Sequence, residues 1–404
     1  MPTLAPKGQG NYLVFFWKKI ALGHVFLEAD QVLTEEEYYV SLLTGIKPTV
    51  QAYAAKSQRS NDQWPTWLME RDLKRWSTWM DAVFAAFLPA NLPPQVPISV
   101  VICTRNRAST LRLCLDSLRS MACQPEEIVI IDNAPTDDST RKVVEDYPGV
   151  RYCLESRPGL SYARNTGVAQ AQCSVLAFTD DDVILHPDWA YRVWETFQDE
   201  AVFAMTGLVI VSELRTEAQQ IFEKHWSFNR GYQDVFYDSA YLSRVLPIGP
   251  PVWHIGAGAN NAFRKKVFNE VGLFDERLGA GASGCSEDSE MWFRILTHGH
   301  TIHYNPRAVV YHGHREHIHE LHSQIFSYMR GHVAAALIQQ QQQPEAGYSQ
   351  HIYHHMPQQY YYLIKGGFPF FRFRNRTLLT ELKGLVSGLI FYYRNRNRAP
   401  QQLP

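Results

Sequence analysis

The chain has 404 residues, with 39 Lys and Arg, 40 Asp and Glu, and a formal net charge of −1. Hydrophobic residues make up 45% and charged residues 20%, a globular composition that excludes a mostly disordered chain, a collagen and a coiled-coil rod. Near neutrality also excludes a uniformly basic nucleic-acid binder. The charge is uneven, however, because residues 363–404 hold eight basic residues and one acidic residue, which leaves −8 on the rest.

Residues 1–95 are predicted to form an accessory region. The apolar runs Leu13–Trp17 and Ile20–Leu27 are separated by two lysines, which is typical of a β-hairpin. Residues 64–88 are rich in tryptophan and have a helical period. The prolines at positions 93, 94 and 97 indicate a linker and therefore the first domain boundary.

From residue 98 onward, short apolar runs alternate with helical patterns. Strands are predicted at 98–103, 127–131, 151–154 and 175–179, with helices at 108–120, 138–146 and 160–171. This alternation indicates βαβ units, so residues 96–320 are predicted to be an α/β domain. Ligands of such sheets bind beyond the carboxyl ends of the strands. Polar residues stand at those ends: Thr104, Arg105 and Arg107, then Asp132, then Asp180, Asp181 and Asp182.

The triplet Asp180, Asp181 and Asp182 is a candidate metal site. Three adjacent carboxylates repel one another, and a divalent cation such as Mg²⁺ or Mn²⁺ would relieve that repulsion. The alternative is a solvated turn or a helix cap, although the next helix should begin only near residue 187. His312 ends a strand-like run and could reach the same edge. The other histidines between positions 298 and 355 lack an HExxH motif or a nearby cysteine, so no zinc site is expected.

Four arginines follow or flank the predicted strand ends, namely Arg105, Arg107, Arg157 and Arg164. Guanidinium groups bind phosphate oxygens in a forked geometry, so arginines beside an acidic triplet indicate an anion bridged to a metal. A nucleoside diphosphate satisfies both. The run from 279 to 284 matches GxGxxG but follows no buried strand, so an NAD site is rejected.

Residues 286–290 are predicted to open a helix, with Ser286 as its N-cap. Acidic residues in a first turn could serve only to stabilise the helix dipole. The glycine-rich loop before them suggests instead that this helix opens onto a substrate. Glu287 and Trp292 are therefore placed on the acceptor side.

Residues 98 to about 315 resemble the family-two glycosyltransferases, which have the GT-A fold. The matching segments are ISVVICTRNR, EIVIIDN, RPGLSYARNTG, VLAFTDDDV, GAGANNAFRKKVFNEVGLFDERLG, SEDSEMWFRI and AVVYHGH. The resemblance implies an inverting, metal-dependent transfer of a sugar from a nucleotide diphosphate donor, most often a UDP-sugar. It also implies a GT-A mixed sheet flanked by helices. In this chain a hairpin and helical region would precede that domain, and a helical extension would follow it.

The resemblance assigns residues to the nucleotide. Thr104 and Arg105 would line the nucleoside pocket, and Asp132 would bond the base or ribose. Arg157 and Arg164 would contact the base or the diphosphate.

The resemblance also assigns residues to the metal ion and to the acceptor. Asp180 and Asp182 take the positions of the DxD motif, with Asp182 the expected direct metal ligand and His312 completing its coordination. Residues 256–261, including Gly258 and Asn260, resemble an acceptor-side loop, and Asp288 takes the position of the catalytic base. The chemistry agrees, because a metal stabilises a diphosphate leaving group and a carboxylate can take the proton of an acceptor hydroxyl.

Residues 321–404 are predicted to be helical, with the glutamines at 339–343 in a surface loop or a frayed helix end. Apolar residues between 378 and 390 recur at helical spacing and are flanked by basic, aromatic segments at 368–376 and 391–398. This pattern fits an anionic membrane surface. The alternative is a helix that packs on the catalytic domain.

The leading prediction is a glycosyltransferase of polysaccharide or glycoconjugate assembly that acts on a glycan or lipid-linked acceptor and binds no nucleic acid. A sugar nucleotidyltransferase and an inactive subunit that binds a glycan or a nucleotide sugar remain alternatives. Neither a leader peptide nor a spanning segment is evident, and the six cysteines form no framework. The expected location is therefore the cytoplasm or, peripherally, the cytoplasmic face of a membrane.

Overall fold

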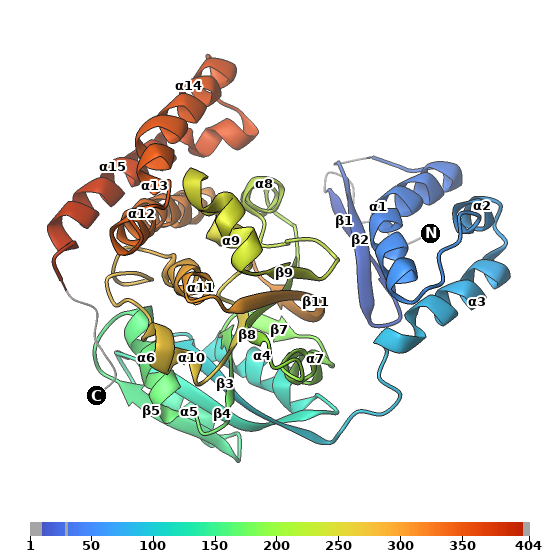
Figure 1. The fold of residues 1–404 in the computed structure, drawn as a ribbon, viewed down its shortest axis with the longest axis horizontal. Helices are drawn as coiled ribbons and strands as arrows, with labels where there is room; N and C mark the ends of the chain where they lie inside the picture. The colour runs from blue at the N-terminus through green and yellow to red at the C-terminus, as the bar shows by residue number, and fades with distance from the viewer. Residues whose placement is uncertain (1–9, 29–30, 399–404) are drawn as a thin grey trace.

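The computed structural model describes residues 10–28 and 31–398 (Figure 1). The expected α/β fold with a mixed sheet is confirmed, since the sheet has nine strands within the described residues and is flanked by helices. Its strands are β3 (Gln95–Thr104), β4 (Gln124–Asn133), β5 (Val150–Glu155), β6 (Val175–Asp180), β7 (Val183–Leu185), β8 (Val202–Val211), β9 (Val235–Tyr237), β10 (Asn260–Arg264) and β11 (Thr301–His312).

The strand order is β5-β4-β3-β6-β10-β8-β11-β7, with β9 paired to β11. Strands β3 to β6 are mutually parallel, whereas β10 runs antiparallel to both β6 and β8. β4 and β5 follow β3 on one side of the sheet, whereas β6 lies on its other side, so the order in which strands are added reverses at β3. Such a switch point forms a crevice at the carboxyl ends of the strands.

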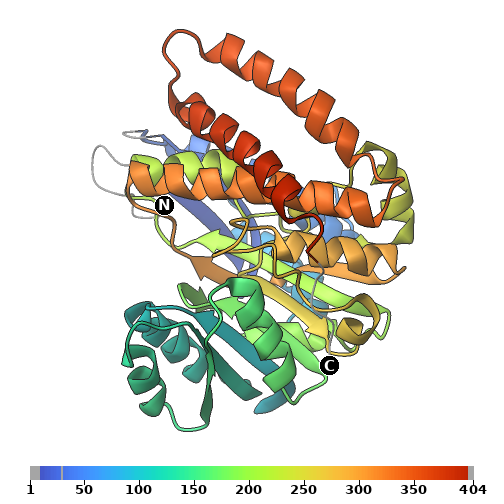
Figure 2. The ribbon, with the colours of Figure 1, turned by 90° about the vertical axis from the view of Figure 1, so that its left-hand side faces the viewer.

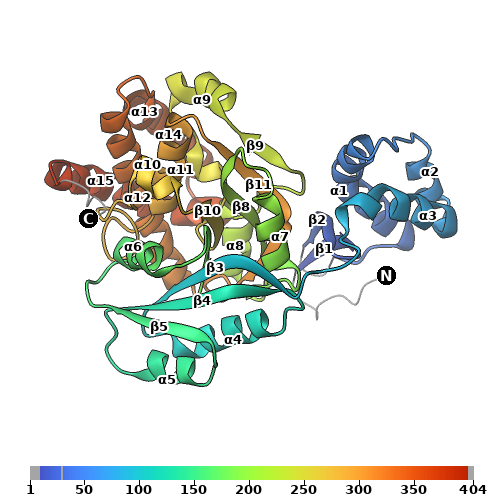
Figure 3. The same ribbon diagram turned by 60° about the horizontal axis from the view of Figure 1, so that its bottom comes forward.

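Helices cover both faces of this sheet. They are α4 (Ala108–Arg119), α5 (Ser139–Glu145), α6 (Leu160–Gln170), α7 (Trp189–Thr196), α8 (Glu217–Trp226), α9 (Ser239–Val245), α10 (Val267–Val271) and α11 (Glu287–Thr297), with short turns η2 (Leu246–Ile248) and η3 (Val252–His254). One core cluster joins α4, α5 and α7 to the sheet, and a second joins α6, α8 and α11 (Figure 3). The central strands are thus buried on both faces, which explains their continuous apolar runs.

The N-terminal region contains the predicted hairpin, β1 (Asn11–Trp17) and β2 (Ile20–Leu27), and the predicted helices within residues 64–88. Its helices and final turn are α1 (Glu35–Lys56), α2 (Trp64–Met69), α3 (Leu73–Phe84) and η1 (Ala85–Phe87). They share a separate apolar cluster with one side of the hairpin, while the other side packs on β8 and β11. A Cβ at Gly23 would lie 2.1 Å from the Gly45 carbonyl oxygen, so the approach of α1 to β2 requires glycine.

The C-terminal region forms a helical layer over the α11 side of the sheet (Figure 2). It consists of α12 (Ile318–Gln342), α13 (Tyr348–Gln350), a π-helical turn η4 (His351–His355), α14 (Met356–Gly367), the 3₁₀ turn η5 (Phe373–Thr377) and α15 (Leu378–Asn395). No helix within residues 10–28 and 31–398 is long and apolar enough to cross a membrane.

The prediction of a surface loop at the glutamine run is wrong. Gln339 to Gln342 form the last turn of α12, and Gln339 is buried with its amide donating to the Ser289 carbonyl at 3.3 Å. Gln342 donates to Glu290 at 2.9 Å. The run therefore joins α12 to α11 through Gln339 and Gln342, while Gln341 and Gln342 are exposed to solvent at the helix end.

Candidate active site

A cleft of about 1230 Å³ opens beside the carboxyl ends of β3 and β6, at the switch point of the sheet. Eleven of the predicted site residues line it: Thr104, Arg105, Arg107, Arg164, Asp180, Asp181, Asp182, Gly258, Glu287, Asp288 and His312. They come from strand ends, from α6, from the loop before β10 and from α11. Only the tertiary structure brings these segments to one cavity.

Asp180, Asp182 and His312 form a candidate metal centre. One ligand atom from each lies within 4.8 Å of the others, and His312 Nε2 is 3.5 Å from Asp182 Oδ1. The sheet register explains this proximity, because His312 at the end of β11 pairs with Val183, the residue after Asp182.

The donor set fits a divalent cation that prefers oxygen ligands and accepts an imidazole. Burial, together with the charge of Asp182, raises the pKa of Asp180. Burial lowers the pKa of His312, which favours the neutral imidazole that ligates metals. Mn²⁺ or Mg²⁺ therefore suits the three residues.

Asp181 has a different role from its two neighbours. Its carboxylate accepts a hydrogen bond from Thr104 Oγ1 at 2.6 Å and forms an ion pair with Arg107 at 2.8 Å. Arg107 also contacts Asp182 at 2.5 Å. Burial raises the pKa of Asp181 to about 7, although Arg107 and Thr104 oppose that shift. Asp181 thus ties β3 to the loop that carries the metal ligands.

Arg164 on α6 lies between the candidate metal ligand Asp180 and the first turn of α11. Its buried guanidinium contacts Glu287 at 2.5 Å, lies 3.9 Å from Asp180 and donates to the Gly258 carbonyl at 3.4 Å. Burial raises the pKa of Glu287 to about 7; the charge of Asp288 adds to the shift and Arg164 opposes it.

Asp288 lies in the first turn of α11 and faces the loop at Gly258, which was predicted to be on the acceptor side. Its Oδ1 accepts from the Ser289 amide at 2.7 Å, while a Cβ added at Gly258 would lie 3.0 Å from its Oδ2. The same Cβ would lie 2.7 Å from an Arg164 nitrogen, so only glycine keeps this approach open. The position suits a carboxylate that must reach an acceptor hydroxyl.

Ser286 occupies the N-cap position, but its predicted capping role is wrong. It has a left-handed backbone, with φ at 73°, and its side chain makes no capping hydrogen bond. Its hydroxyl instead lies 3.1 Å from Cys285 Sγ. The tight turn after the glycine-rich loop requires this conformation, which points the side chain away from the helix amides.

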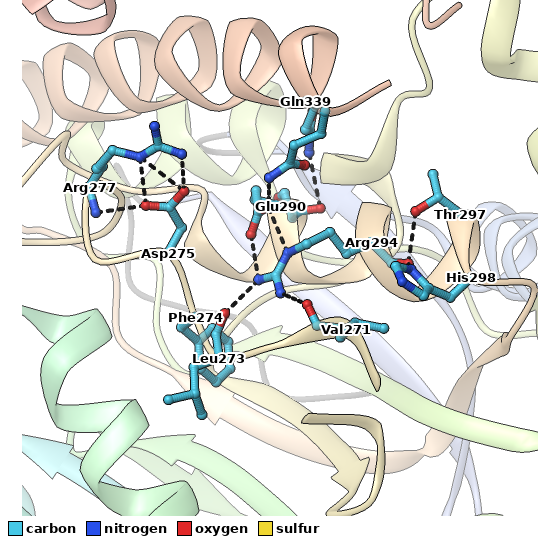
Figure 4. A network of polar contacts seen from close by, with 12 residues as sticks. Val271, Leu273, Phe274, Asp275, Arg277, Glu290, Arg294, Thr297, His298 and Gln339 are labelled. Carbon is cyan, nitrogen blue, oxygen red and sulfur yellow. Dashed lines mark hydrogen bonds and ion pairs between the residues drawn. The ribbon is translucent and has the colours of Figure 1, made fainter. Parts of the chain in front are cut away.

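A polar network holds α11 in place (Figure 4). Arg294 donates to Glu290 at 2.7 Å and to the carbonyls of Val271 and Leu273. Close by, Asp275 and Arg277 form a multiple hydrogen-bonded ion pair. With the Gln339 contact to Ser289, these bonds fix the helix that carries Asp288.

Four of the predicted site residues do not line this cleft: Asp132, Arg157, Asn260 and Trp292. Asp132 is fully buried and accepts from the Tyr152 hydroxyl, while its neighbour Asn133 lines the cleft. Arg157 pairs with Glu155. Asn260 bonds backbone carbonyls inside the sheet, and Trp292 belongs to the core.

The cleft also contains residues that were not predicted, including Arg230, Trp253, Tyr328 and Tyr360. Arg230 donates to the carbonyls of Ser227 and Trp253, and burial lowers its pKa. These residues lie on loops and helices outside the motif segments, and no local pattern distinguishes them. They widen the cleft beyond Asp288 toward the C-terminal helices.

Residues 99–272 match the model of the glycosyl transferase family 2. This segment of the chain therefore belongs to glycosyltransferase family 2, and it makes up less than half of the 404 residues. The match ends before α11 and β11, which supply Asp288 and His312.

Curated relatives agree with this assignment. A pre-mycofactocin glycosyltransferase of Mycobacterium tuberculosis is 29% identical over 244 residues, which cover 58% of this chain and 47% of the relative. A glucosyl-dolichyl phosphate glucuronosyltransferase of Haloferax volcanii is 24% identical over 224 residues, covering 53% of this chain and 68% of the relative. The chain thus spans about half the length of the mycobacterial relative.

Among solved structures, a mannosyltransferase of Pyrobaculum calidifontis in complex with GDP-Man and Mn²⁺ matches with a TM-score of 0.46. It is 17% identical, and the match covers 86% of this chain and all of that one.

Proposed function

We propose that the protein is an inverting, metal-dependent glycosyltransferase. It transfers a sugar from a nucleotide diphosphate donor to a hydroxyl acceptor in polysaccharide or glycoconjugate biosynthesis. The observation that carries the proposal is the shared cleft: the cluster of Asp180, Asp182 and His312 and the carboxylate of Asp288 line one cavity, with Arg164 between them.

Asp180, Asp182 and His312 would hold Mn²⁺ or Mg²⁺, and the ion would neutralise the charge that grows on the leaving diphosphate. Arg105, which also lines the cleft, contributes a further positive charge on the donor side. On the opposite side, Asp288 takes the proton of the acceptor hydroxyl as the oxygen attacks the anomeric carbon. One base and one displacement invert the configuration of that carbon.

The proposed substrates are a nucleotide diphosphate sugar, most often a UDP-sugar by family resemblance, and a glycan or lipid-linked acceptor. The Haloferax relative acts, by its name, on a glucosyl-dolichyl phosphate, which supports a lipid-linked acceptor. The proposed location is cytoplasmic, on or near the cytoplasmic face of a membrane. We also retain the division into an accessory region (1–95), a catalytic domain (96–320) and a C-terminal helical region (321–404).

Two other functions share parts of the site. A nucleotidyltransferase would use the sheet and the metal ligands but would have no need for Asp288 beside Gly258, and it would release pyrophosphate. A catalytically inactive binding subunit would bind the donor without turnover.

The test measures release of nucleoside diphosphate from UDP- and GDP-sugars, with Mn²⁺ or with a chelator, for the wild type and Asp288→Asn. Wild-type release should require metal, and Asp288→Asn should lower it by about 10²–10⁴-fold. Because the substitution preserves shape, donor and Mn²⁺ should still raise the melting temperature of the variant. Asp146→Asn, at an exposed ion pair with Arg112, is the matched control.

Near wild-type turnover by the folded Asp288→Asn variant would contradict the assignment of the base. Pyrophosphate as the product would support the nucleotidyltransferase instead. Donor binding without turnover by the wild type would support the inactive subunit.

A further inference from the structure

The end of the chain forms a helical hairpin with an exposed apolar tip. The C-terminal hairpin is defined here as residues 356–398: α14, the connection through η5, and α15. In Figure 2 α14 and the connection lie at the upper edge of the molecule, whereas α15 lies against α12. Three phenylalanines of the connection are strongly exposed: Phe368 by 73%, Phe370 by 74% and Phe373 by 69%.

Helix α15 has two apolar faces with different environments. Gly384 and Gly388 pack on α12, where a Cβ added to either would lie within 2.8 Å of Met329 or Val333 side-chain atoms. On another face the apolar side chains are 48–72% exposed: Leu379, Val386, Ile390 and Tyr393. The helix thus packs on the domain, as one of the two predictions from the sequence expected, and still presents apolar residues to solvent.

The same hairpin is strongly basic on its surface. Glu381 is its only acidic residue, and it is buried with Arg374, Tyr360 and Thr377 bonded to it. Exposed basic residues surround the apolar ones: Lys365, Arg372, Lys383, Arg394, Arg396 and Arg398. An exposed apolar surface interleaved with cations fits the headgroup region of an anionic bilayer.

We propose that the C-terminal hairpin binds the surface of an anionic lipid bilayer, with Phe368, Phe370 and Phe373 inserted at the boundary between headgroups and acyl chains. A second copy of the chain fits less well, because charged residues are depleted from the cores of protein interfaces. In a symmetric dimer through this surface, the basic residues of one copy would be buried against those of the other. Lipid phosphates carry the opposite charge and therefore complement these basic residues.

The inner side of the hairpin contributes a wall of the cleft, through Met356, Gln359, Tyr360 and Arg374. A bilayer bound to the outer side would therefore lie close to the acceptor half of the cleft. If the proposed glycosyl transfer is right, this arrangement delivers a lipid-linked acceptor from the membrane surface. The membrane contact itself can be tested without any turnover.

The experiment is co-sedimentation of the full chain with vesicles of phosphatidylcholine alone and of phosphatidylcholine mixed with phosphatidylglycerol. We expect binding to the anionic vesicles that weakens as salt is raised. The variant Phe368→Ser/Phe370→Ser/Phe373→Ser should bind at least tenfold more weakly, because three apolar anchors are lost. Leu113→Ser/Leu154→Ser is the matched control, since these leucines are also exposed (60% and 58%) but lie outside the hairpin.

A second variant tests the charges. Arg372→Gln/Lys383→Gln/Arg394→Gln should weaken binding to anionic vesicles by about a hundredfold at low salt, because each cation near such a surface contributes about a factor of five. Binding to neutral vesicles should change little. Unchanged thermal unfolding of both variants shows that the fold is intact.

Equal vesicle binding by the wild type and the phenylalanine variant would overturn the proposal. The proposal would also be overturned if the wild type bound no vesicles but formed concentration-dependent dimers that the phenylalanine variant could not form. Failure of donor turnover would count against the proposed reaction alone, since the vesicle measurement does not depend on it.

Discussion

Glu287 and Asp288 are adjacent carboxylates with different environments. Glu287 is buried against Arg164, whereas Asp288 faces Gly258 across the cleft. Successive helical residues point about 100° apart, so one carboxylate can hold the scaffold while the next meets substrate. Adjacent carboxylates also differ at the end of β6 and in the turn after it, where Asp181 points toward Thr104 and Arg107.

The hydrogen bonds of Glu155 lead to a prediction about how the stability of the fold depends on pH. Its carboxylate accepts bonds from the Arg157 side chain and amide and from Thr166, and the Arg157 bonds lower its pKa from 4.5 to about 2. Its stabilising contribution is thus complete above about pH 4.5 and is lost as the pH falls toward 2.

We expect Glu155→Gln to lower the free energy of unfolding by about 1–3 kcal/mol at pH 7, because bonds to a charged group are lost. The difference from the wild type should shrink between pH 5 and pH 3. Urea unfolding across this range measures it, with the exposed Glu145→Gln as control. A difference that stays constant with pH would contradict the assignment.

At the scale of elements, the contact of α12 with α15 depends on two glycines. Gly384→Ala would place its Cβ 2.7 Å from Met329 Cβ and 2.8 Å from the Phe326 carbonyl oxygen. The helices would have to separate, so we expect a loss of about 1–3 kcal/mol of stability. Gly366→Ala is the control, because nothing lies within 4 Å of a Cβ there.

The control should raise stability by about 0.5–1 kcal/mol, since alanine favours a helix over glycine. Chemical unfolding of the two variants gives the comparison. Equal stability of both would show that the packing of α15 on α12 contributes little.

At the scale of the whole molecule, the N-terminal region and α15 lie at opposite ends of the structure (Figures 1 and 3). Asp234 ties the N-terminal region to the sheet. It contacts Lys56 of α1 at 2.7 Å and, on β11, His303 at 2.9 Å and Arg307 at 3.0 Å.

Asp234→Asn should lower the free energy of unfolding by about 3–5 kcal/mol, because it leaves the mostly buried Arg307 without its carboxylate. Thermal unfolding measures the loss, and faster proteolysis within residues 31–95 would show that the N-terminal region is released. Asp81→Asn, at an exposed pair with Lys18, should change neither. An unchanged melting temperature of Asp234→Asn would mean that apolar packing alone joins the regions.

The sequence predicted those elements whose signal is local. The βαβ strands are continuous apolar runs because both faces of the sheet are covered. The hairpin and the helices of residues 64–88 were predicted from the spacing of their apolar residues. No helix was predicted at α1, although Thr34 and Glu37 form a capping box, because Gly45 and Pro48 weaken its interior pattern.

The sequence by itself also indicated which residue types meet at the candidate site, because the acidic triplet, the arginines and His312 follow or flank predicted strands. Only the tertiary structure decided which of them meet. Sheet register brings His312 to Asp182, whereas Asp132, Asn260 and Trp292 are buried by contacts from strands and helices distant in sequence. Tertiary packing likewise divided the apolar residues of α15 between α12 and solvent, because the direction of each side chain depends on where the helix docks.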